Sequence, residues 1–284
     1  MKKILVTGGV GFIGSNLIKG LRDKEFEVFS LDNYSTGDKK NEIPGVTYIN
    51  DDIINIFKLD KDFDTCFHLA AQSRVQPSFE NPEESLRVNV LGTSKVMEWA
   101  LKNNIKVVYA GSSSKHHTPS DSPYAMYKFL GEEICKLYKK SFEVSVEIAR
   151  FYNVYGPGEN IDEKFGNVIG IWSAKIRKKE AIPIVGDGEQ KRDFIHVLDL
   201  VDGLIKISKS NIKHNDAWEL GTGVSYSVNE LFNLFKKKYN VESIYVPDQS
   251  GNYRKTLRIN DDALKLLNWE PVDRLKNHIE NLNL

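Results

Sequence analysis

The chain has 284 residues, of which 40% are hydrophobic, and its 39 Lys and Arg residues balance 39 Asp and Glu residues. This length and hydrophobic content suit one large domain or two modest domains with a sizeable core. Balanced charge provides no global field that would hold the chain on nucleic acid or on an anionic membrane, so we expect neither as a partner. A charged ligand would need a local site.

The cysteines and the first residues indicate a cytoplasmic protein. Cys66 and Cys135 lie in apolar surroundings without partners at metal-binding spacing, so we expect reduced core thiols and no metal. The opening MKKILVTGG has only a brief apolar run before its glycines. That pattern fits neither a signal peptide nor a membrane span.

Strand-like and helix-like segments alternate over the first half of the chain. Apolar runs typical of strands occupy residues 3–8, 27–32, 46–50, 64–70, 105–112 and 144–151. Helical periodicity occupies residues 12–24, 82–103 and 123–141. Runs rich in β-branched residues that alternate with helices predict an α/β fold, a Rossmann-type doubly wound parallel sheet covered by helices.

The composition of the sequence changes after about residue 151, where Gly, Pro and Asn become frequent and the predicted strands become short. We expect residues 1–154 to form the first domain, with a helix near 194–210 packing back on it. Residues 155–193 and 211–284 would form a smaller substrate-binding domain. Ligands of open α/β sheets bind beyond the carboxyl ends of the strands, so the cleft between the two parts is the expected site.

The stretch TGGVGFIG follows the first predicted strand and opens the first predicted helix. One glycine permits the tight turn, one lets the backbone approach a pyrophosphate, and one lets helix and strand pack closely. The helix N-terminus supplies free N–H groups for the phosphates. The residues expected to contact a dinucleotide here are Gly8, Gly11, Phe12, Ile13 and Gly14.

Asp32 ends the second predicted strand, 18 residues after Gly14. A carboxylate there accepts hydrogen bonds from the ribose hydroxyls and repels a 2′-phosphate, and the following Asn33 and Tyr34 offer no arginine to that phosphate. The sequence therefore favours NAD over NADP. Asp52 and Ile53 follow the third strand at the expected adenine edge, although capping of the next helix is an equal alternative for Asp51 or Asp52.

Ten segments, in this order, resemble the extended short-chain dehydrogenase/reductases, and within them the NAD-dependent epimerase/dehydratase family. They are TGGVGFIGSNL, LDNYSTG, DDI, HLAAQSRVQPSFENP, NVLGT, SPYAMYK, ARFYNVYGPG, GDGEQKRDFIHVLDLVDG, ELGTG and LNWEP. The resemblance covers nearly the whole chain. It implies a nucleotide-sugar substrate, which composition alone does not.

The resemblance implies a reacting set of Ser112, Tyr124 and Lys128, the family's Tyr-x-x-x-Lys pair with an upstream hydroxyl. Residues four apart share a helix face, so Lys128 can serve Tyr124 but not Tyr127. A free phenol has a pKa of about 10, which nearby cations lower. Lys128 would also hold the nicotinamide ribose, and Ser113 is the alternative to Ser112.

Further cofactor contacts follow from the resemblance alone. Ala70 and Ala71 would line the cofactor groove, and Asn89 would support it through hydrogen bonds. On the substrate side, Asn153 would contact the sugar diphosphate and Arg192 would clamp it with a bidentate fork. An ion pair with a neighbouring aspartate, Asp193 or Asp199, is the alternative for Arg192.

Three positions depart from the family pattern. Arg74 stands where most members have a small residue, and it would reach the sugar or a phosphate, or cap the next segment. Gln249 replaces a second diphosphate arginine, for which Arg254 or Arg258 would compensate. His116 and His117 occupy a shortened loop, either against the substrate or as plain surface residues.

The residues after Ser112 bear on the reaction. Family dehydratases carry Asp-Glu there, whereas this chain has Ser113 and Ser114, whose hydroxyls cannot serve as acid and base. The expectation is thus a 4-epimerase of a UDP-hexose or UDP-N-acetylhexosamine that works through a transient 4-keto sugar, with Tyr124 as base. Alternatives are another nucleotide-sugar oxidoreductase or dehydratase, or a non-catalytic NAD-binding protein. We expect a homodimer through helices 83–102 and 124–140.

Overall fold

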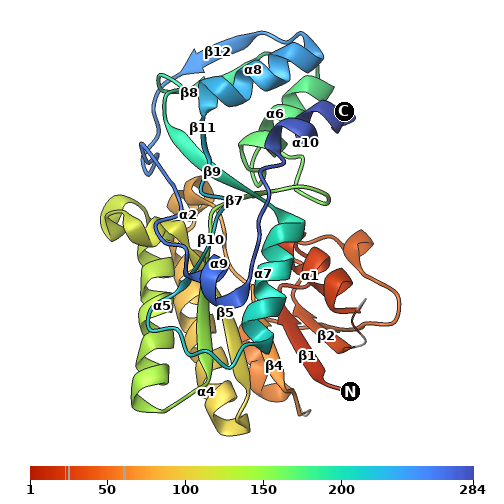
Figure 1. The fold of residues 1–284 in the computed structure, drawn as a ribbon, viewed down its shortest axis with the longest axis vertical. Coiled ribbons are helices and arrows are strands. Elements are labelled where there is room, and N and C mark those ends of the chain that lie inside the picture. The colour runs from red at the N-terminus through yellow and green to blue at the C-terminus, as the bar shows by residue number, and fades with distance from the viewer. Residues whose placement is uncertain (23, 25, 60–61) are drawn as a thin grey trace.

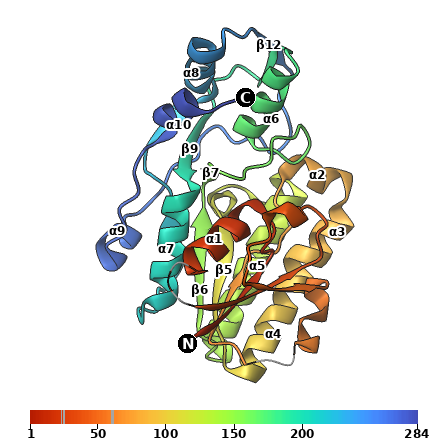
Figure 2. The same cartoon turned by 90° about the vertical axis from the view of Figure 1, so that its right-hand side faces the viewer.

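The computed structural model describes residues 1–22, 24, 26–59 and 62–284. Figures 1 and 2 show a large sheet flanked by helices, with a smaller body of short strands and helices beyond one end of its strands. The predicted α/β fold is confirmed. All six strand pairings in the large sheet are parallel.

The large sheet has seven strands in the order β10-β6-β5-β4-β1-β2-β3. Six of them lie in the runs predicted from the sequence. Their bounds are β1 Lys3–Thr7, β2 Glu27–Asp32, β3 Thr47–Asn50, β4 Thr65–His68, β5 Lys106–Ser112, β6 Val146–Phe151 and β10 Trp218–Leu220. The chain reverses its direction of winding between β1 and β4, which is where ligands of such sheets bind.

Each face of the large sheet has its own core. Ile4 and Val6 of β1 pack toward α1 (Phe12–Arg22) and α7 (Val197–Lys209), whereas Leu5 points to the opposite core with α4 (Thr93–Asn103) and α5 (Pro123–Ser141). This alternation follows from the two-residue period of a strand. Of the helix predicted at 12–24, residue 23 lies outside the described residues. Helix α7 packs on α1, as expected for a segment that returns to the first domain.

The single helix predicted at 82–103 is divided. It comprises α3 (Pro82–Leu86), a π-helical turn (Arg87–Gly92) and α4 (Thr93–Asn103). The π turn carries Asn89, which is buried and hydrogen-bonds a loop of the site. Such insertions are frequent at functional sites, and periodicity does not reveal them.

The smaller body has its own apolar core, built around Trp172, Phe194 and Phe235. One sheet has the order β11-β9-β7, and β12 pairs with β8. Its elements are β7 Asn153–Tyr155, α6 Val168–Arg177, β8 Ile182–Val185, β9 Lys191–His196, β11 Ser225–Ser227, α8 Val228–Tyr239, β12 Ser243–Val246 and α10 Leu275–Asn281.

The predicted domain boundary needs a correction within 211–284. Strand β10 is the outermost strand of the large sheet, and the segment of α9 (Asp262–Leu267) packs on that sheet through Ala263 and Trp269. The indole of Trp269 donates to the carbonyl oxygen of Asp199 on α7 at 2.8 Å. The chain therefore crosses between the two bodies more often than its composition indicates.

Candidate active site

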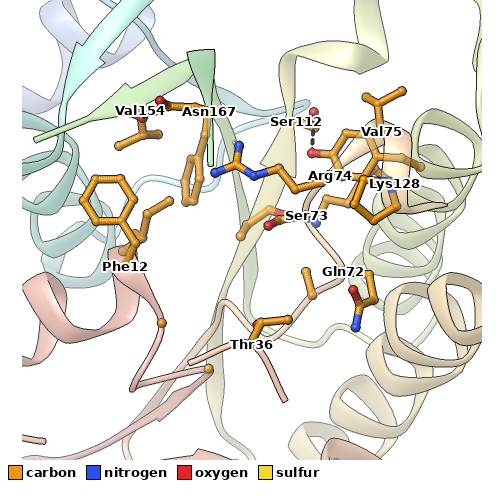
Figure 3. A pocket seen from close by; sticks show the side chains of 18 of the residues that line it. Phe12, Thr36, Gln72, Ser73, Arg74, Val75, Ser112, Lys128, Val154 and Asn167 are labelled. Atoms are coloured by element: carbon orange, nitrogen blue, oxygen red, sulfur yellow. Dashed lines mark hydrogen bonds between the residues drawn. The ribbon is translucent and has the colours of Figure 1, made fainter. Parts of the chain in front are cut away.

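A cleft of about 900 Å³ opens between the carboxyl ends of the large sheet's strands and the smaller body. That volume is in the range of small-molecule sites. Figure 3 shows Phe12 and Thr36 on one side of it, and Ser112 and Lys128 on another. The cleft therefore lies at the place where the topology of the large sheet predicts a ligand.

The glycine turn behaves as its sequence predicts. Gly8 has φ +74°, and a Cβ there would lie 2.9 Å from the backbone nitrogen of Ala70. A Cβ on Gly14 would lie 2.1 Å from the carbonyl oxygen of Gly8, so helix and turn can approach only without it. Gly11 faces the cleft, and a Cβ there would meet only the Gly8 oxygen, at 3.3 Å. Phe12 and Ile13 also line the cleft.

Asp32 joins this turn to the end of β2. Its carboxylate accepts hydrogen bonds from the backbone N–H groups of Val10, at 3.0 Å, and Tyr34, at 2.8 Å. Burial raises its pKa, and these two bonds oppose the rise. Because Asp32 and Asn33 also line the cleft, a carboxylate faces the place where an adenosine ribose would lie.

Asp52 has protein partners at the predicted adenine edge, and its contact with the cofactor stays a prediction. Its carboxylate caps the 3-10 helix Ile53–Lys58 and receives two bonds from Arg87, at 2.9 and 2.8 Å. The hydrogen bonds from Arg87 lower the pKa of Asp52 to about 2. Asp51 and Ile53 line the cleft, whereas Asp52 does not. The capping alternative therefore describes Asp52.

Asn89 lies behind the loop that lines the cofactor side of the cleft and holds the backbone of that loop by hydrogen bonds. It exchanges two 3.0 Å hydrogen bonds with the backbone of Gln72, and the nearby N–H of Ala70 donates to the Thr7 hydroxyl at 3.1 Å. Ala70 and Ala71 line the cleft, but Asn89 does not. Its position beneath the loop agrees with the expected supporting role.

The proposed reacting residues lie together. The Tyr124 hydroxyl donates to Ser112 Oγ at 3.2 Å, and the Ser114 hydroxyl donates to the same oxygen at 2.9 Å. Lys128 donates to the carbonyl oxygen of Ala110. Ser113 also lines the cleft, but Ser112 holds the tyrosine, and Tyr127 does not line the cleft.

Electrostatics distinguish the tyrosine from the lysine. Burial raises the pKa of Tyr124, while the hydrogen bond to Ser112 and the charge of Arg74 lower it. Burial lowers the pKa of Lys128 to about 8. A positive charge bound beside Tyr124 would therefore favour its phenolate further.

A buried network of charged side chains holds the backbone of Ser112, and the sequence analysis did not predict it. Glu132 accepts from the backbone N–H of Ser112 at 3.3 Å and from Arg150 Nη2 at 2.8 Å. Arg150 also donates to Glu219 at 2.9 Å, and all three ionic side chains are almost fully buried. Glu132 lies four residues after Lys128, so the two side chains share one face of the helix. That spacing is the feature of the sequence that could have indicated Glu132.

Arg192 and Asn153 reach the substrate side of the cleft. Arg192 donates to Asn252 at 2.6 Å, and burial lowers its pKa to about 10. No ion pair involves Arg192 within the described ranges. Asp193 instead accepts from Thr222 and Gly223, and Asp199 pairs with Arg274 at 3.1 Å, so the ion-pair alternative for Arg192 is wrong.

Asn153 lines the cleft while its amide donates to the carbonyl oxygen of Asp193 at 3.0 Å. Arg254 does not line the cleft, contrary to the prediction. It is exposed and pairs with Asp187 at 2.8 Å. Arg258 is likewise engaged, by Gly221 and Asp261. The loop instead presents Gln249, Asn252 and Tyr253 to the cleft.

Neither loop histidine lines the cleft. His116 bonds Glu219 at 2.9 Å, while His117 stacks on Tyr253 with ring centroids 3.8 Å apart. His117 therefore supports a residue of the cleft wall. Arg74 does line the cleft, and its Nε donates to the carbonyl oxygen of Phe165 at 2.8 Å.

A glycine turn with an acidic partner, next to a Ser-Tyr-Lys set, defines an enzyme of the short-chain dehydrogenase/reductase class. The chain belongs to the NAD dependent epimerase/dehydratase family, whose profile matches residues 4–221. NAD is accordingly its cofactor, and the turn, Asp32 and Lys128 fit that molecule.

The chain is 36% identical to a putative UDP-glucose 4-epimerase of Methanocaldococcus jannaschii, across 98% of this chain and 96% of the relative. The solved UDP-glucose 4-epimerase of Thermotoga maritima, with UDP-glucose, superposes with a TM-score of 0.90 at 28% identity, over 98% and 96% of the two chains. A UDP-glucuronic acid 4-epimerase of Bacillus cereus, with UDP-glucuronic acid and NAD, gives 0.88 at 25%, over 98% and 96%.

UDP-glucuronic acid decarboxylases are also among the similar proteins, and solved dehydratases share the fold. Family membership thus establishes an enzyme of the nucleotide-sugar epimerase/dehydratase type. Across the described ranges, no helix is long and apolar enough to cross a membrane.

Proposed function

We propose that the protein is an NAD-dependent nucleotide-sugar 4-epimerase that acts on a UDP-hexose or a UDP-N-acetylhexosamine. The observation that carries the proposal is the hydrogen bond between Tyr124 and Ser112, with serines rather than acids at 113 and 114. A dehydratase would need a proton donor and a base at those two places. Epimerisation at C4 needs only the tyrosine and its supports.

Each residue has a distinct task in this reaction. Tyr124 Oη takes the proton of the sugar O4 hydroxyl as the 4-keto sugar forms, and returns it when the inverted alcohol forms. Ser112 Oγ, fixed by Tyr124 and Ser114, hydrogen-bonds the same sugar oxygen. The Lys128 ammonium favours the phenolate. NAD, held by the glycine turn and Asp32, would supply the hydride acceptor and donor that the two oxidation changes at C4 need.

The remaining residues bind and orient. Gly8, Gly11 and Gly14 would hold the pyrophosphate of NAD, and Asp32 its adenosine ribose. Arg192, which has no carboxylate partner among the residues described, would hold the sugar diphosphate, with Asn153 beside it. The 4-keto sugar would turn about its phosphate linkage while these contacts retain the nucleotide.

Incubation with a panel of nucleotide sugars, followed by proton NMR, tests the proposal. We expect inversion at C4 without loss of water and without added NAD, if NAD co-purifies. A 4-keto-6-deoxy product would refute the epimerase reaction in favour of a dehydratase. No conversion of any sugar, with NAD still bound, would favour the non-catalytic alternative.

We also propose a cytoplasmic homodimer. Leu86, Leu91 and Leu137 are between 42% and 52% exposed on the α3 to α5 side of the molecule, an apolar face suited to a second copy. Both cysteines are buried free thiols, as a reducing compartment allows. Light scattering of the intact protein measures the state directly, and a monomer at micromolar concentration would contradict the dimer.

A further inference from the structure

Arg74 is a cation without a carboxylate partner in the wall of the cleft. Its Nε is used by the carbonyl oxygen of Phe165, which fixes the plane of the guanidinium. In the described part of the chain, no Asp or Glu lies within ion-pair distance of it. Figure 3 shows its side chain extending into the cavity from the side of Lys128 toward Val154 and Asn167.

Other cations around the cleft differ from Arg74. Lys164, which also lines the cleft, pairs with Glu80 at 2.7 Å. Arg192, too, has no carboxylate partner among the residues that the structure describes, but the proposed function already assigns it the sugar diphosphate. Burial lowers the pKa of Arg74, while the charges of Tyr124 and Glu159, neither of which forms an ion pair with it, oppose the shift. Arg74 is therefore a cation of the cleft wall to which the proposed function assigns no ligand group.

The place of Arg74 indicates which part of a ligand it meets. Arg74 and Tyr124 are close enough for their charges to interact, and Tyr124 is the residue proposed to act at C4 of the sugar. In a pyranose ring C1, which carries the diphosphate, lies opposite C4, whereas C5 and its C6 substituent are adjacent to C4. An anion held near Tyr124 is thus better placed on C6 than on C1.

We propose that the sugar of the substrate is a hexuronic acid, the C6-oxidised form of a hexose, and that Arg74 binds its C6 carboxylate. The inference rests on the proposed nucleotide-sugar 4-epimerase function and replaces the neutral sugar named there with an acidic one. Ser73 and Ser113 line the same cleft and offer hydroxyl donors to the second carboxylate oxygen. A guanidinium forms two parallel hydrogen bonds with a carboxylate, a geometry that lysine cannot provide.

Charge balance at the reacting end is consistent with this assignment. A carboxylate two carbons from the reacting C4 would raise the pKa of Tyr124 by like-charge repulsion. The positive charge of Arg74 would offset the negative charge of that carboxylate. A neutral hexose would need no such compensation, and it would leave the guanidinium without an anionic partner.

Steady-state kinetics with UDP-glucuronic acid and UDP-glucose test the inference. We expect wild-type kcat/KM to be higher for the uronic acid, and Arg74→Gln to lower kcat/KM for the uronic acid roughly 10- to 100-fold more than kcat/KM for UDP-glucose, whose loss would reflect only the weaker support of the Tyr124 phenolate. Arg74→Lys, which keeps the charge, should recover part of the loss. Arg192→Gln is the matched control and should weaken both substrates alike. Near-UV circular dichroism checks that each variant is folded.

The outcomes separate this inference from the proposed function. Equal losses for both substrates in Arg74→Gln would overturn the inference and assign Arg74 to the diphosphate. Wild-type preference for UDP-glucose or UDP-N-acetylglucosamine would overturn it as well. Calorimetric binding of UDP-glucuronic acid that depends on Arg74, with a decarboxylated pentose product, would support the carboxylate site while refuting 4-epimerisation.

Discussion

The two sides of the cleft are built differently. The cofactor side comes mainly from one strand-turn-helix unit, and its decisive features are glycines packed against backbone, such as Gly14 against Gly8. The sugar side comes from segments distant in the sequence, which bring together long polar side chains, among them Arg74, Arg192 and Gln249. A short local sequence thus specifies the cofactor, while long-range packing determines what else is bound.

Tyr124 stands where the two sides meet, and its loss should have the largest effect. Tyr124→Phe keeps the ring but removes the group proposed to move the O4 proton, so we expect kcat to fall by roughly 10²- to 10⁴-fold. Bound NAD, measured by absorbance after release, should be unchanged. Tyr127→Phe is the matched control on the same helix and should retain activity. The reverse pattern would show that the tyrosine is assigned in the wrong register.

Gly14→Ala should disrupt the cofactor side through its fold. The added Cβ would lie 2.1 Å from the Gly8 oxygen, so turn and helix must separate, at a cost of about 3 kcal/mol or more in free energy of unfolding. Urea denaturation measures it. Gly11→Ala is the control, since its Cβ meets only one atom at 3.3 Å; it should leave stability nearly unchanged and weaken NAD binding. Equal stability of Gly14→Ala and wild type would contradict the packing described.

Lys128 should impose a pH dependence on stability. Its folded pKa of about 8 lies below its ordinary value of 10.5, so at pH 7 the folded state bears the full cost of a buried ammonium. As pH rises above 8, the folded state loses its proton before the unfolded state does, and stability increases. Between pH 7 and 9.5 this contribution is about 2 kcal/mol. In urea titrations, the free energy of unfolding of Lys128→Met should lack that rise with pH. If the difference in this free energy between wild type and variant were constant with pH, the prediction would be wrong.

Local patterns predicted much of this molecule. Six strands of the large sheet and the packing of Gly8 and Gly14 depend on residues close in sequence, and Tyr124 and Lys128 are one helix period apart. These features are encoded within short windows, so reading the chain segment by segment was sufficient for them. The pairing of Ser112 with Tyr124 was instead expected from the family resemblance.

The failures share a cause, which is a distant partner. Asp52 was expected to line the cofactor site, but Arg87, 35 residues away, binds its carboxylate, and Asp52 does not line the cleft. Strand β10 joins the large sheet because Trp218–Leu220 pairs with β6, some 70 residues earlier in the chain. No local window contains these partners, and a polar residue beside a predicted site is equally suited to packing and to binding.

The smallest effect is expected at Arg254, whose predicted substrate role depended on sequence position alone. The side chain is exposed and pairs with an exposed Asp187, and such pairs contribute little to stability because solvent screens them. Arg254→Gln should therefore leave the midpoint of urea unfolding nearly unchanged and KM for the nucleotide sugar within about twofold. Arg192→Gln, by contrast, changes a residue of the cleft wall and should raise KM for the nucleotide sugar strongly. A large rise in KM for Arg254→Gln would mean that the loop closes over the substrate and exchanges Asp187 for the diphosphate, because only that movement brings the guanidinium to the ligand.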